Sequence, residues 1–195
     1  MPTVKAMEKA FQAGDASRES DCIVITRIES PVGLLLAGAN SDGLCLLEFT
    51  DRRLIETQLA TVGRKFSSAI VPGENRHTEK LRGELEAYFA GGLTEFSLPL
   101  IYPGSQFQIN VWSELLRIPY GETISYEELA RRVGSPSAQR AVGHANGLNR
   151  IAIVIPCHRV VNKSGKLGGY GGGLWRKQFL LNLERRAESE LRLFA

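Results

Sequence analysis

The chain has 195 residues, 43% of them hydrophobic and 23% charged, with a formal net charge of +3 at pH 7. This composition is that of a globular protein with one large or two compact domains. No apolar stretch approaches the roughly 20 residues that cross a bilayer, and residues 1–20 lack the apolar core of a secretory signal. We therefore expect no membrane partner.

The three cysteines, Cys22, Cys45 and Cys157, are odd in number and form no CxxC pair. This pattern argues against a disulfide framework and against a cysteine-rich zinc site. His77 is the only histidine in the first half of the chain, so no zinc ligand set is expected there either. We expect no metal, no cofactor and a location in the reducing cytoplasm. Cys22 and Cys45 are interpreted as inert core residues.

The charge is distributed unevenly along the chain. Residues 1–102 carry 11 Lys and Arg against 14 Asp and Glu, whereas residues 103–195 carry 13 against 7. No acidic residue lies between Leu129 and Leu183. The cations in that interval are Arg131, Arg132, Arg140, Arg150, Arg159, Lys163, Lys166, Arg176 and Lys177. A solvated basic face is one interpretation, but the lack of any compensating carboxylate favours nucleic acid as the partner.

The first half of the chain predicts a strand-rich domain. After residues 1–20, an N-terminal extension of low information, three apolar or β-rich runs alternate with turn signals and predict an antiparallel meander. The runs are residues 22–30, 33–40 and 43–50. Helical periodicity then predicts helices over Asp51–Val62 and Glu74–Ala90, the second of which ends at Gly91.

An extended segment over residues 93–104 precedes the change in charge, which places a domain boundary near residue 102. The predicted organisation is an extension over residues 1–20, a strand-rich domain over residues 21–102 and a mainly helical domain over residues 103–195. The fold class is α/β, in its α+β form. The helical domain begins with a helix predicted over Ser105–Arg117.

The sequence from residue 125 predicts two helices in close succession. Ser125 and Glu128 have the spacing of a capping box, in which each side chain binds the other residue's amide. Gly134 suits the position after the helix end. Ser135 then caps a second helix, with Pro136 at its first position. Two helices joined by so short a turn predict a helix-turn-helix.

The second of these helices has two different faces. The face expected in the core holds Ala138, Ala141, Val142 and Ala145. The opposite face holds Arg140, Gly143, His144 and Gly147. Each helical glycine costs about 1 kcal/mol relative to alanine, so this face is suited to close approach by another surface. DNA contacted through Arg140 is favoured over the alternative of merely tolerated surface residues.

The run "IAIVIPCHRVV" at residues 151–161 predicts a buried strand that ends at Pro156 and presents Cys157 at its rim. The surrounding cations favour the thiolate form of such a cysteine, and His158 can accept its proton directly or through a water. Glu184, the first acid after the basic stretch, is the candidate to orient the imidazole.

Residues 162–174, "NKSGKLGGYGGGL", contain six glycines, five of them within three positions of Tyr170, without the lysine-serine pattern of a P-loop. We interpret them as a flexible wall over a flat pocket, in which backbone amides reach the edge of a ligand. A surface loop is the alternative.

Three motifs in this order closely resemble the O6-alkylguanine-DNA alkyltransferases: "RAVGHANGLN", "PCHRV" and "GYGGGLWRKQFLLNLE". The resemblance is strong over roughly residues 100–186 and extends in outline to the first half, for which it implies a small RNase H-like domain. It implies DNA repair by direct damage reversal, in which Cys157 takes the alkyl group from O6-alkylguanine, and from O4-alkylthymine, once and irreversibly. The implied partner is double-stranded DNA contacted in the minor groove, and we expect a monomer.

The resemblance also implies roles for single residues. The implied catalytic residues are Cys157 as acceptor, His158 as water-mediated base, Glu184 holding the histidine, Asn149 bracing the turn, and Tyr126 donating to the purine. The implied DNA contacts are Arg140, as a finger that fills the gap of a flipped nucleotide, with Gly143, Ser135 and Ala141. The substrate pocket comprises the carbonyls of Val160 and Cys157, the amide of Gly171, and Tyr170 and Lys177.

Arg150 stands where many members of this family have proline, which leaves the stiffness of that turn open. Two other functions stay open. A cysteine hydrolase with the same triad would release product repeatedly. A catalytically silent protein that recognises alkyl damage is the second alternative, although relatives of that kind carry tryptophan at the position of Cys157.

Overall fold

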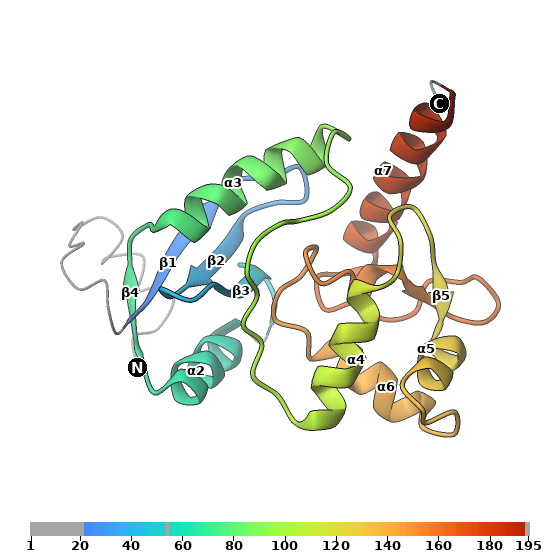
Figure 1. Cartoon of the computed structure of the whole chain (residues 1–195), viewed down its shortest axis with the longest axis horizontal. Coiled ribbons are helices and arrows are strands. Elements are labelled where there is room, and N and C mark those ends of the chain that lie inside the picture. The colour runs from blue at the N-terminus through green and yellow to red at the C-terminus, as the bar shows by residue number, and fades with distance from the viewer. Residues whose placement is uncertain (1–21, 54, 194–195) are drawn as a thin grey trace.

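A computed structural model of the chain describes residues 22–53 and 55–193; the predicted N-terminal extension lies outside them. A four-stranded mixed sheet forms the first half (Figure 1). Its strands are β1 (Cys22–Ile28), β2 (Leu35–Ala39), β3 (Leu44–Phe49) and β4 (Ala69–Pro72), in the spatial order β3-β2-β1-β4. The predicted antiparallel meander of β1, β2 and β3 is confirmed. β4 was not predicted, because its four residues are too few to show a pattern, and it pairs parallel to β1.

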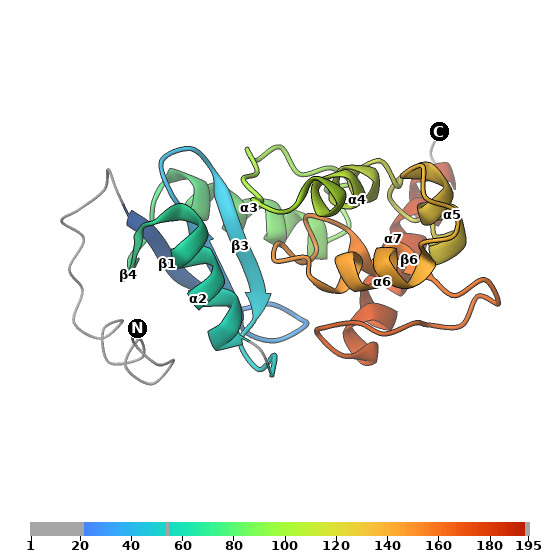
Figure 2. The same cartoon turned by 90° about the horizontal axis from the view of Figure 1, so that it is seen from below.

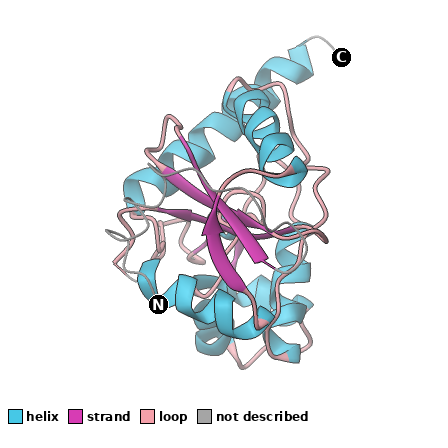
Figure 3. Cartoon of the chain, turned by 90° about the vertical axis from the view of Figure 1, so that its left-hand side faces the viewer, coloured by secondary structure: helices cyan, strands magenta, loops and turns pink. Residues whose placement is uncertain are grey.

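Helices cover both faces of this sheet (Figure 3). On one face, α2 (Ile55–Phe66) packs its apolar side against alternate strand residues such as Ile23 and Ile25. On the other face lies α3 (Arg76–Phe89), whose apolar residues join a larger core that continues into the second half of the chain. The predicted α3 is correct to within two residues at its start. α2 begins at Ile55 and ends at Phe66, four residues later at each end than predicted. Arg52, which precedes it, contacts the second half of the chain through its side chain.

The second half is mainly helical. Its helices are α4 (Gln106–Leu116), α5 (Tyr126–Arg132), α6 (Gln139–Gly147) and α7 (Leu174–Leu193), with a short parallel pair of β5 (Ile124–Ser125) and β6 (Val160–Val161). Trp112 of α4 is buried and its indole N–H donates to the Ala145 carbonyl of α6 at 2.9 Å. No helix in the described part of the chain combines the length and apolarity that crossing a membrane requires. The α/β class predicted from the sequence is confirmed.

The outer edge of β3 joins the two halves (Figure 2). The N–H of Leu47 donates to the Arg150 carbonyl at 2.8 Å, and the N–H of Ala152 donates back to the Leu47 carbonyl at 2.8 Å. Residues 99–101 pair with Leu44 in the same way. A strand edge that would otherwise expose unpaired amides is thereby covered. These hydrogen bonds tie the backbone on either side of Ile151 to β3.

Candidate functional site

The segment that carries Cys157 is a tight buried turn, and the predicted strand is wrong. The N–H of Ile155 donates to the Ile151 carbonyl at 2.9 Å, and Ile153 adopts φ of 72°. This left-handed conformation is rare for a β-branched residue. All of residues 151–155 are buried, so an apolar pattern alone could not distinguish an extended from a coiled backbone.

Asn149 stabilises this turn through both the oxygen and the nitrogen of its side-chain amide. Its Oδ1 accepts from the N–H of Ile151 at 3.0 Å, and its Nδ2 lies 2.8 Å from the Ile155 carbonyl. The same Nδ2 lies 3.1 Å from Sγ of Cys157. Asn149 is 3% exposed, so no water competes for these bonds. One buried amide thus fixes both the strained turn and the position of the sulfur.

The Cys157 thiol is protonated in the free protein. Burial raises its pKa, and the hydrogen bond from Asn149 opposes this effect. The nearby Glu48 carboxyl raises the pKa further, while Lys177 and Arg52 lower it. The expectation that cations favour the thiolate is therefore wrong for the resting state, because the cost of burying a charge exceeds their attraction. The thiol needs a base.

His158, which follows Cys157 in the chain, forms a buried hydrogen-bonded pair with Glu184. Nε2 of His158 lies 2.8 Å from Oε1 of Glu184, and both side chains are fully buried. Burial lowers the pKa of His158, which keeps the imidazole neutral. Burial alone would raise the pKa of Glu184, but His158 and Arg159 outweigh it and lower the pKa to about 2. An ionised carboxylate only accepts, so Nε2 carries the proton. Nδ1 is buried without a protein partner and is free to accept another proton.

Tyr126 and Lys177 lie on the other side of the glycine-rich loop. A Cβ on Gly168 would come within 3.0 Å of the Tyr126 hydroxyl, so only glycine allows this close approach. Burial and Cys157 raise the pKa of Tyr126, which keeps its phenol a proton donor. Nζ of Lys177 donates to the Val160 carbonyl at 2.6 Å, and burial lowers the pKa of Lys177 to about 8. Lys177 is fully buried and supports the pocket wall.

A narrow pocket beside Cys157 is lined by residues from both halves. The lining comprises Glu48, Phe49, Arg52, Asn146, Gly147, Asn149, Ala152, Cys157, Gly169, Tyr170, Gly171 and Gly172. The structure therefore brings Asn149, Tyr170 and Gly171 to the cysteine as predicted, whereas Tyr126, Val160 and Lys177 line a neighbouring region. Within residues 22–53 and 55–193, no three His, Cys, Asp or Glu side chains gather as metal ligands.

Two charged side chains of the first half, Glu48 and Arg52, reach this pocket, and the sequence did not predict them. Glu48 is fully buried and forms an ion pair with Arg52. Arg52 also donates to the Gly147 carbonyl at 2.8 Å, at the end of α6. A Cβ on Gly171 would come within 2.6 Å of the Arg52 guanidinium carbon. Sequence analysis could have identified Glu48 as a candidate, because it is an acidic residue within the apolar run "LCLLEF".

Asn146 and Arg159 were also missed. Nδ2 of Asn146 lies 3.4 Å from the Cys157 carbonyl, and its Oδ1 is buried without a partner. Arg159 binds Glu184 through Nε at 2.8 Å and Nη2 at 3.0 Å. Asn146 looked unremarkable among polar helix residues, and Arg159 looked like part of the basic stretch.

The turn between α5 and α6 differs in detail from the prediction. Ser125 Oγ accepts from the Glu128 N–H at 3.0 Å, but the Glu128 carboxylate binds Arg131 and Arg132 instead of completing a capping box. Gly134 has φ of 72° and ends α5 as predicted.

The start of α6 also differs from the prediction. The helix begins at Gln139, without a side-chain cap, so Ser135 does not cap it and Pro136 is not its first residue. Its N-terminal cap is Ala138, which is only half-buried.

The faces of α6 are partly as predicted. Val142 and Ala145 are buried, but Ala141 is exposed and Asn146 takes its place in the core. Arg140 is exposed, and a Cβ on Gly143 would meet the Tyr126 ring at 3.7 Å. The outward face therefore begins beside Tyr126.

The basic stretch is less exposed than its composition indicates. Arg159, Arg176 and Lys177 are buried, and Arg150 is half-buried. Arg176 forms an ion pair with Asp51 at 2.9 Å. Arg159, Arg176 and Lys177 serve the interior, so the charge available to a polyanion is smaller than +9.

The fold and site thus define a class: an α/β protein in which one buried thiol, backed by an imidazole–carboxylate pair, lies beside a helix with an exposed arginine.

The family described as 6-O-methylguanine DNA methyltransferase, DNA binding domain, matches residues 106–186. A methylated-DNA–protein-cysteine methyltransferase of Mycolicibacterium paratuberculosis is 48% identical over 170 residues, which cover 86% of this chain and 96% of that protein. One from Methanosarcina barkeri is 45% identical and covers 80% of this chain and 94% of its own.

Solved structures agree with this match. The crystal structure of Mycobacterium tuberculosis O6-methylguanine methyltransferase superposes with a TM-score of 0.75 at 42% identity, covering 89% of this chain and 99% of that one. The structure of Mycobacterium tuberculosis OGT in complex with DNA gives a TM-score of 0.73 at 43% identity, covering 84% and 94%. The chain belongs to the methylated-DNA–protein-cysteine methyltransferase family, which confirms the resemblance drawn from its motifs.

Proposed function

We propose that this protein repairs DNA by moving the alkyl group of O6-alkylguanine onto Sγ of Cys157, in a single irreversible turnover. The observation that carries the proposal is the arrangement of a thiol immediately before a neutral imidazole whose far nitrogen is held by an ionised, buried carboxylate. O4-alkylthymine, which offers the same carbon–oxygen bond, is proposed as a second substrate.

The reaction is a displacement at saturated carbon. Nδ1 of His158, acting through a water, takes the proton of the Cys157 thiol as sulfur attacks the alkyl carbon. The carbon–sulfur bond forms while the bond from carbon to O6 breaks, and the electron pair stays on the purine. The Tyr126 phenol and the Gly171 amide donate to the purine and stabilise this charge. Guanine finally holds the proton that the thiol lost. The thioether has no carbonyl for water to attack, so the protein is consumed.

The supporting residues keep the acceptor in place. Asn149 fixes the sulfur and the turn that presents it. We propose that the carbonyls of Val160 and Cys157 accept from the guanine amine. Lys177 already donates to Val160, which leaves that carbonyl its second lone pair. Tyr170, whose hydroxyl is buried without a partner, closes the pocket over the base.

We further propose that α5 and α6 act as a helix-turn-helix on double-stranded DNA, with α6 at the minor groove. The target atom is inaccessible in a duplex, so the base must be flipped out at a cost of a few kcal/mol. Arg140 would fill the resulting gap. Gly143, Ser135 and Ala141 would let the backbone approach closely, and the exposure of Ala141 supports that place. The minor groove carries a degenerate code, so little sequence preference is expected.

The finer organisation is part of the same proposal. The strand order β3-β2-β1-β4, with a parallel fourth strand, supports an RNase H-like domain over residues 21–102. Residues 103–195 would form the alkyltransferase domain, with residues 1–20 as an extension. The protein would work as a monomer in the cytoplasm, where its three free cysteines stay reduced.

Benzyl transfer tests the function against a cysteine hydrolase and a silent recognition protein. The full chain is incubated with excess O6-benzylguanine, and intact-protein and peptide masses are measured. We expect one benzyl group per chain, on Cys157, and release of one equivalent of guanine. Continued release beyond one equivalent would indicate a hydrolase. A Cys157→Ala variant that binds alkylated duplex without gaining mass would separate binding from chemistry, whereas an unmodified wild-type protein that still binds would be a recognition protein.

A further inference from the structure

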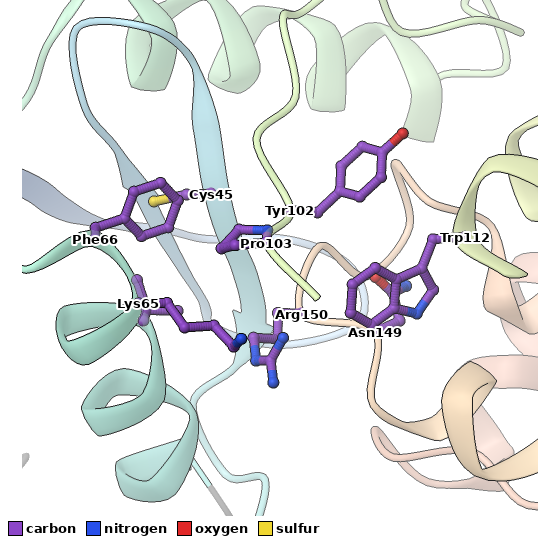
Figure 4. Close-up of a pocket in the computed structure, with 9 residues that line it drawn as sticks. Cys45, Lys65, Phe66, Tyr102, Pro103, Trp112, Asn149 and Arg150 are labelled. Atoms are coloured by element: carbon purple, nitrogen blue, oxygen red, sulfur yellow. The ribbon is translucent and has the colours of Figure 1, made fainter. Parts of the chain in front are cut away.

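A second pocket lies between the two halves of the chain, away from Cys157 (Figure 4). Its floor is largely apolar and aromatic and includes Phe66, Tyr102 and Trp112. Two cations line it, Lys65 from the last turn of α2 and Arg150 from the segment after α6. In Figure 4 the Lys65 side chain extends toward the Arg150 guanidinium, so that the two charged groups point at one another.

No carboxylate within residues 22–53 and 55–193 forms an ion pair with either cation. Nε of Arg150 is buried and makes no hydrogen bond. Burial lowers the pKa of Arg150, and the positive charge of Arg52 adds to this effect. A buried donor without a partner costs about 1–3 kcal/mol. An anion between the two cations would offset this cost and balance their charge.

Other exposed cations in the described part of the chain differ from this pair. Several have a carboxylate partner, namely Lys80, Arg82, Arg117, Arg131, Arg132 and Lys163. Cations that are exposed without an ion pair there include Arg64 and Lys65 on α2 and Arg140 on α6. In Figures 1 and 2, α2 and α6 lie on the same side of the molecule. The unneutralised charge thus continues from α6 across the junction to α2.

We propose that Lys65 and Arg150 together bind one backbone phosphate of the DNA that α6 contacts, so that the footprint extends onto the first half of the chain. This inference rests on the proposed function. A phosphate accepts hydrogen bonds from a guanidinium and an ammonium at once, and Arg150 follows the end of α6 by three residues. The Trp112 ring, 5.9 Å from the Arg150 guanidinium carbon, keeps that group at the pocket.

The test is the salt dependence of binding to an unmodified duplex, measured by fluorescence anisotropy on the full chain. Each neutralised phosphate contributes about 0.9 to the slope of log affinity against log salt. We expect Lys65→Gln and Arg150→Gln each to reduce the slope, and the double variant to reduce it by about 0.9 in all. The effects are not additive, because both residues bind the same phosphate.

Arg64→Gln is the matched control. It removes the same charge from the neighbouring position of the same helix, where the side chain points in a different direction, and we expect an unchanged slope. Equal losses for Arg64→Gln and Lys65→Gln would mean a diffuse effect of net charge and would overturn the proposal. Fully additive losses, or no loss in the Lys65→Gln variant, would overturn it as well.

A further arm measures the thermal stability of the wild type and both variants with inorganic phosphate. Phosphate that stabilises only the wild type, together with unchanged duplex slopes, would indicate a free-anion site instead of a DNA contact and would contradict the proposal. Benzyl transfer by the wild type is measured separately. If the wild type transfers the benzyl group but the variants leave the salt slope unchanged, only the phosphate contact is refuted. If the wild type fails to transfer the group, the proposed function is refuted.

Discussion

Nε2 of His158 lies 2.8 Å from Oε1 of Glu184 in an environment that excludes solvent from both side chains. The same carboxylate accepts from the Tyr88 hydroxyl at 2.7 Å, the Gly121 N–H at 3.1 Å and the Arg159 guanidinium. Glu184 therefore orients the His158 imidazole and at the same time compensates a buried arginine. A substitution there affects both reactivity and stability.

Glu184→Gln should destabilise the protein by about 3 kcal/mol, because it leaves the Arg159 charge buried without a counter-ion. The free energy of unfolding is measured by urea denaturation at neutral pH. Glu114→Gln is the control, since it breaks an ion pair with the exposed Arg117 and should cost about 1 kcal/mol or less. Similar losses of unfolding free energy in the two variants would show that the buried ion pair stabilises the protein no more than the exposed one.

Acid should destabilise the wild type through the same pair. The folded pKa of Glu184 is about 2, against an ordinary 4.5, so its contribution is full above about pH 4.5 and is lost as the pH falls toward 2. Burial lowers the pKa of His158 below its ordinary 6.5; keeping this histidine neutral costs stability as the pH falls below 6.5. We expect urea midpoints to fall between about pH 6 and pH 3, and to fall less steeply below about pH 4.5 in Glu184→Gln. Parallel curves for the two proteins would contradict this assignment.

Asn149→Asp should raise the pKa of the Cys157 thiol. The substitution replaces the donor that faces Sγ with an acceptor that carries negative charge. The measurement is the pH dependence of Cys157 modification by iodoacetamide, followed by peptide mass spectrometry. Asn182→Asp, at an exposed position of α7, is the control. An unchanged thiol pKa in Asn149→Asp would mean that this amide holds only the turn.

Arg140→Ala should slow benzyl transfer from an O6-benzylguanine duplex by about tenfold, which corresponds to about 1.4 kcal/mol of lost support for the flipped state. Transfer from the free base should stay unchanged, because no gap has to be filled. Arg131→Ala removes an equal charge from the exposed side of α5 and serves as control. Equal slowing of both substrates by Arg140→Ala would refute the finger role.

Arg52→Met should destabilise the protein by about 3–5 kcal/mol, because Glu48 would be left buried and unpaired. Combining it with Glu48→Gln should recover part of the loss, since the double variant buries no charge. Chemical denaturation of the two single variants and the double variant checks this cycle. Strictly additive losses would show that the two side chains act independently.

The sequence by itself determined the family, and it singled out Cys157, His158 and Glu184 as the proposed acceptor, base and orienting acid. These inferences rested on which residues are neighbours in the sequence and on the order of the motifs, and neither depends on the folded structure. The meander of β1, β2 and β3 and the extents of α3 and α4 were also readable, because alternation, helical period and caps such as Ser105 are local signals.

Only the tertiary structure decided the rest. The backbone of residues 151–155 coils because Asn149 and β3 satisfy its polar groups, and burial on all sides had removed any periodic signal. The resting thiol is protonated because desolvation, which no sequence count contains, outweighs the nearby cations. Glu48, Arg52 and Lys65 reach the second half only through packing of the sheet against it. Which cations face solvent and which are buried is likewise a property of the fold, because charge counts carry no information on depth.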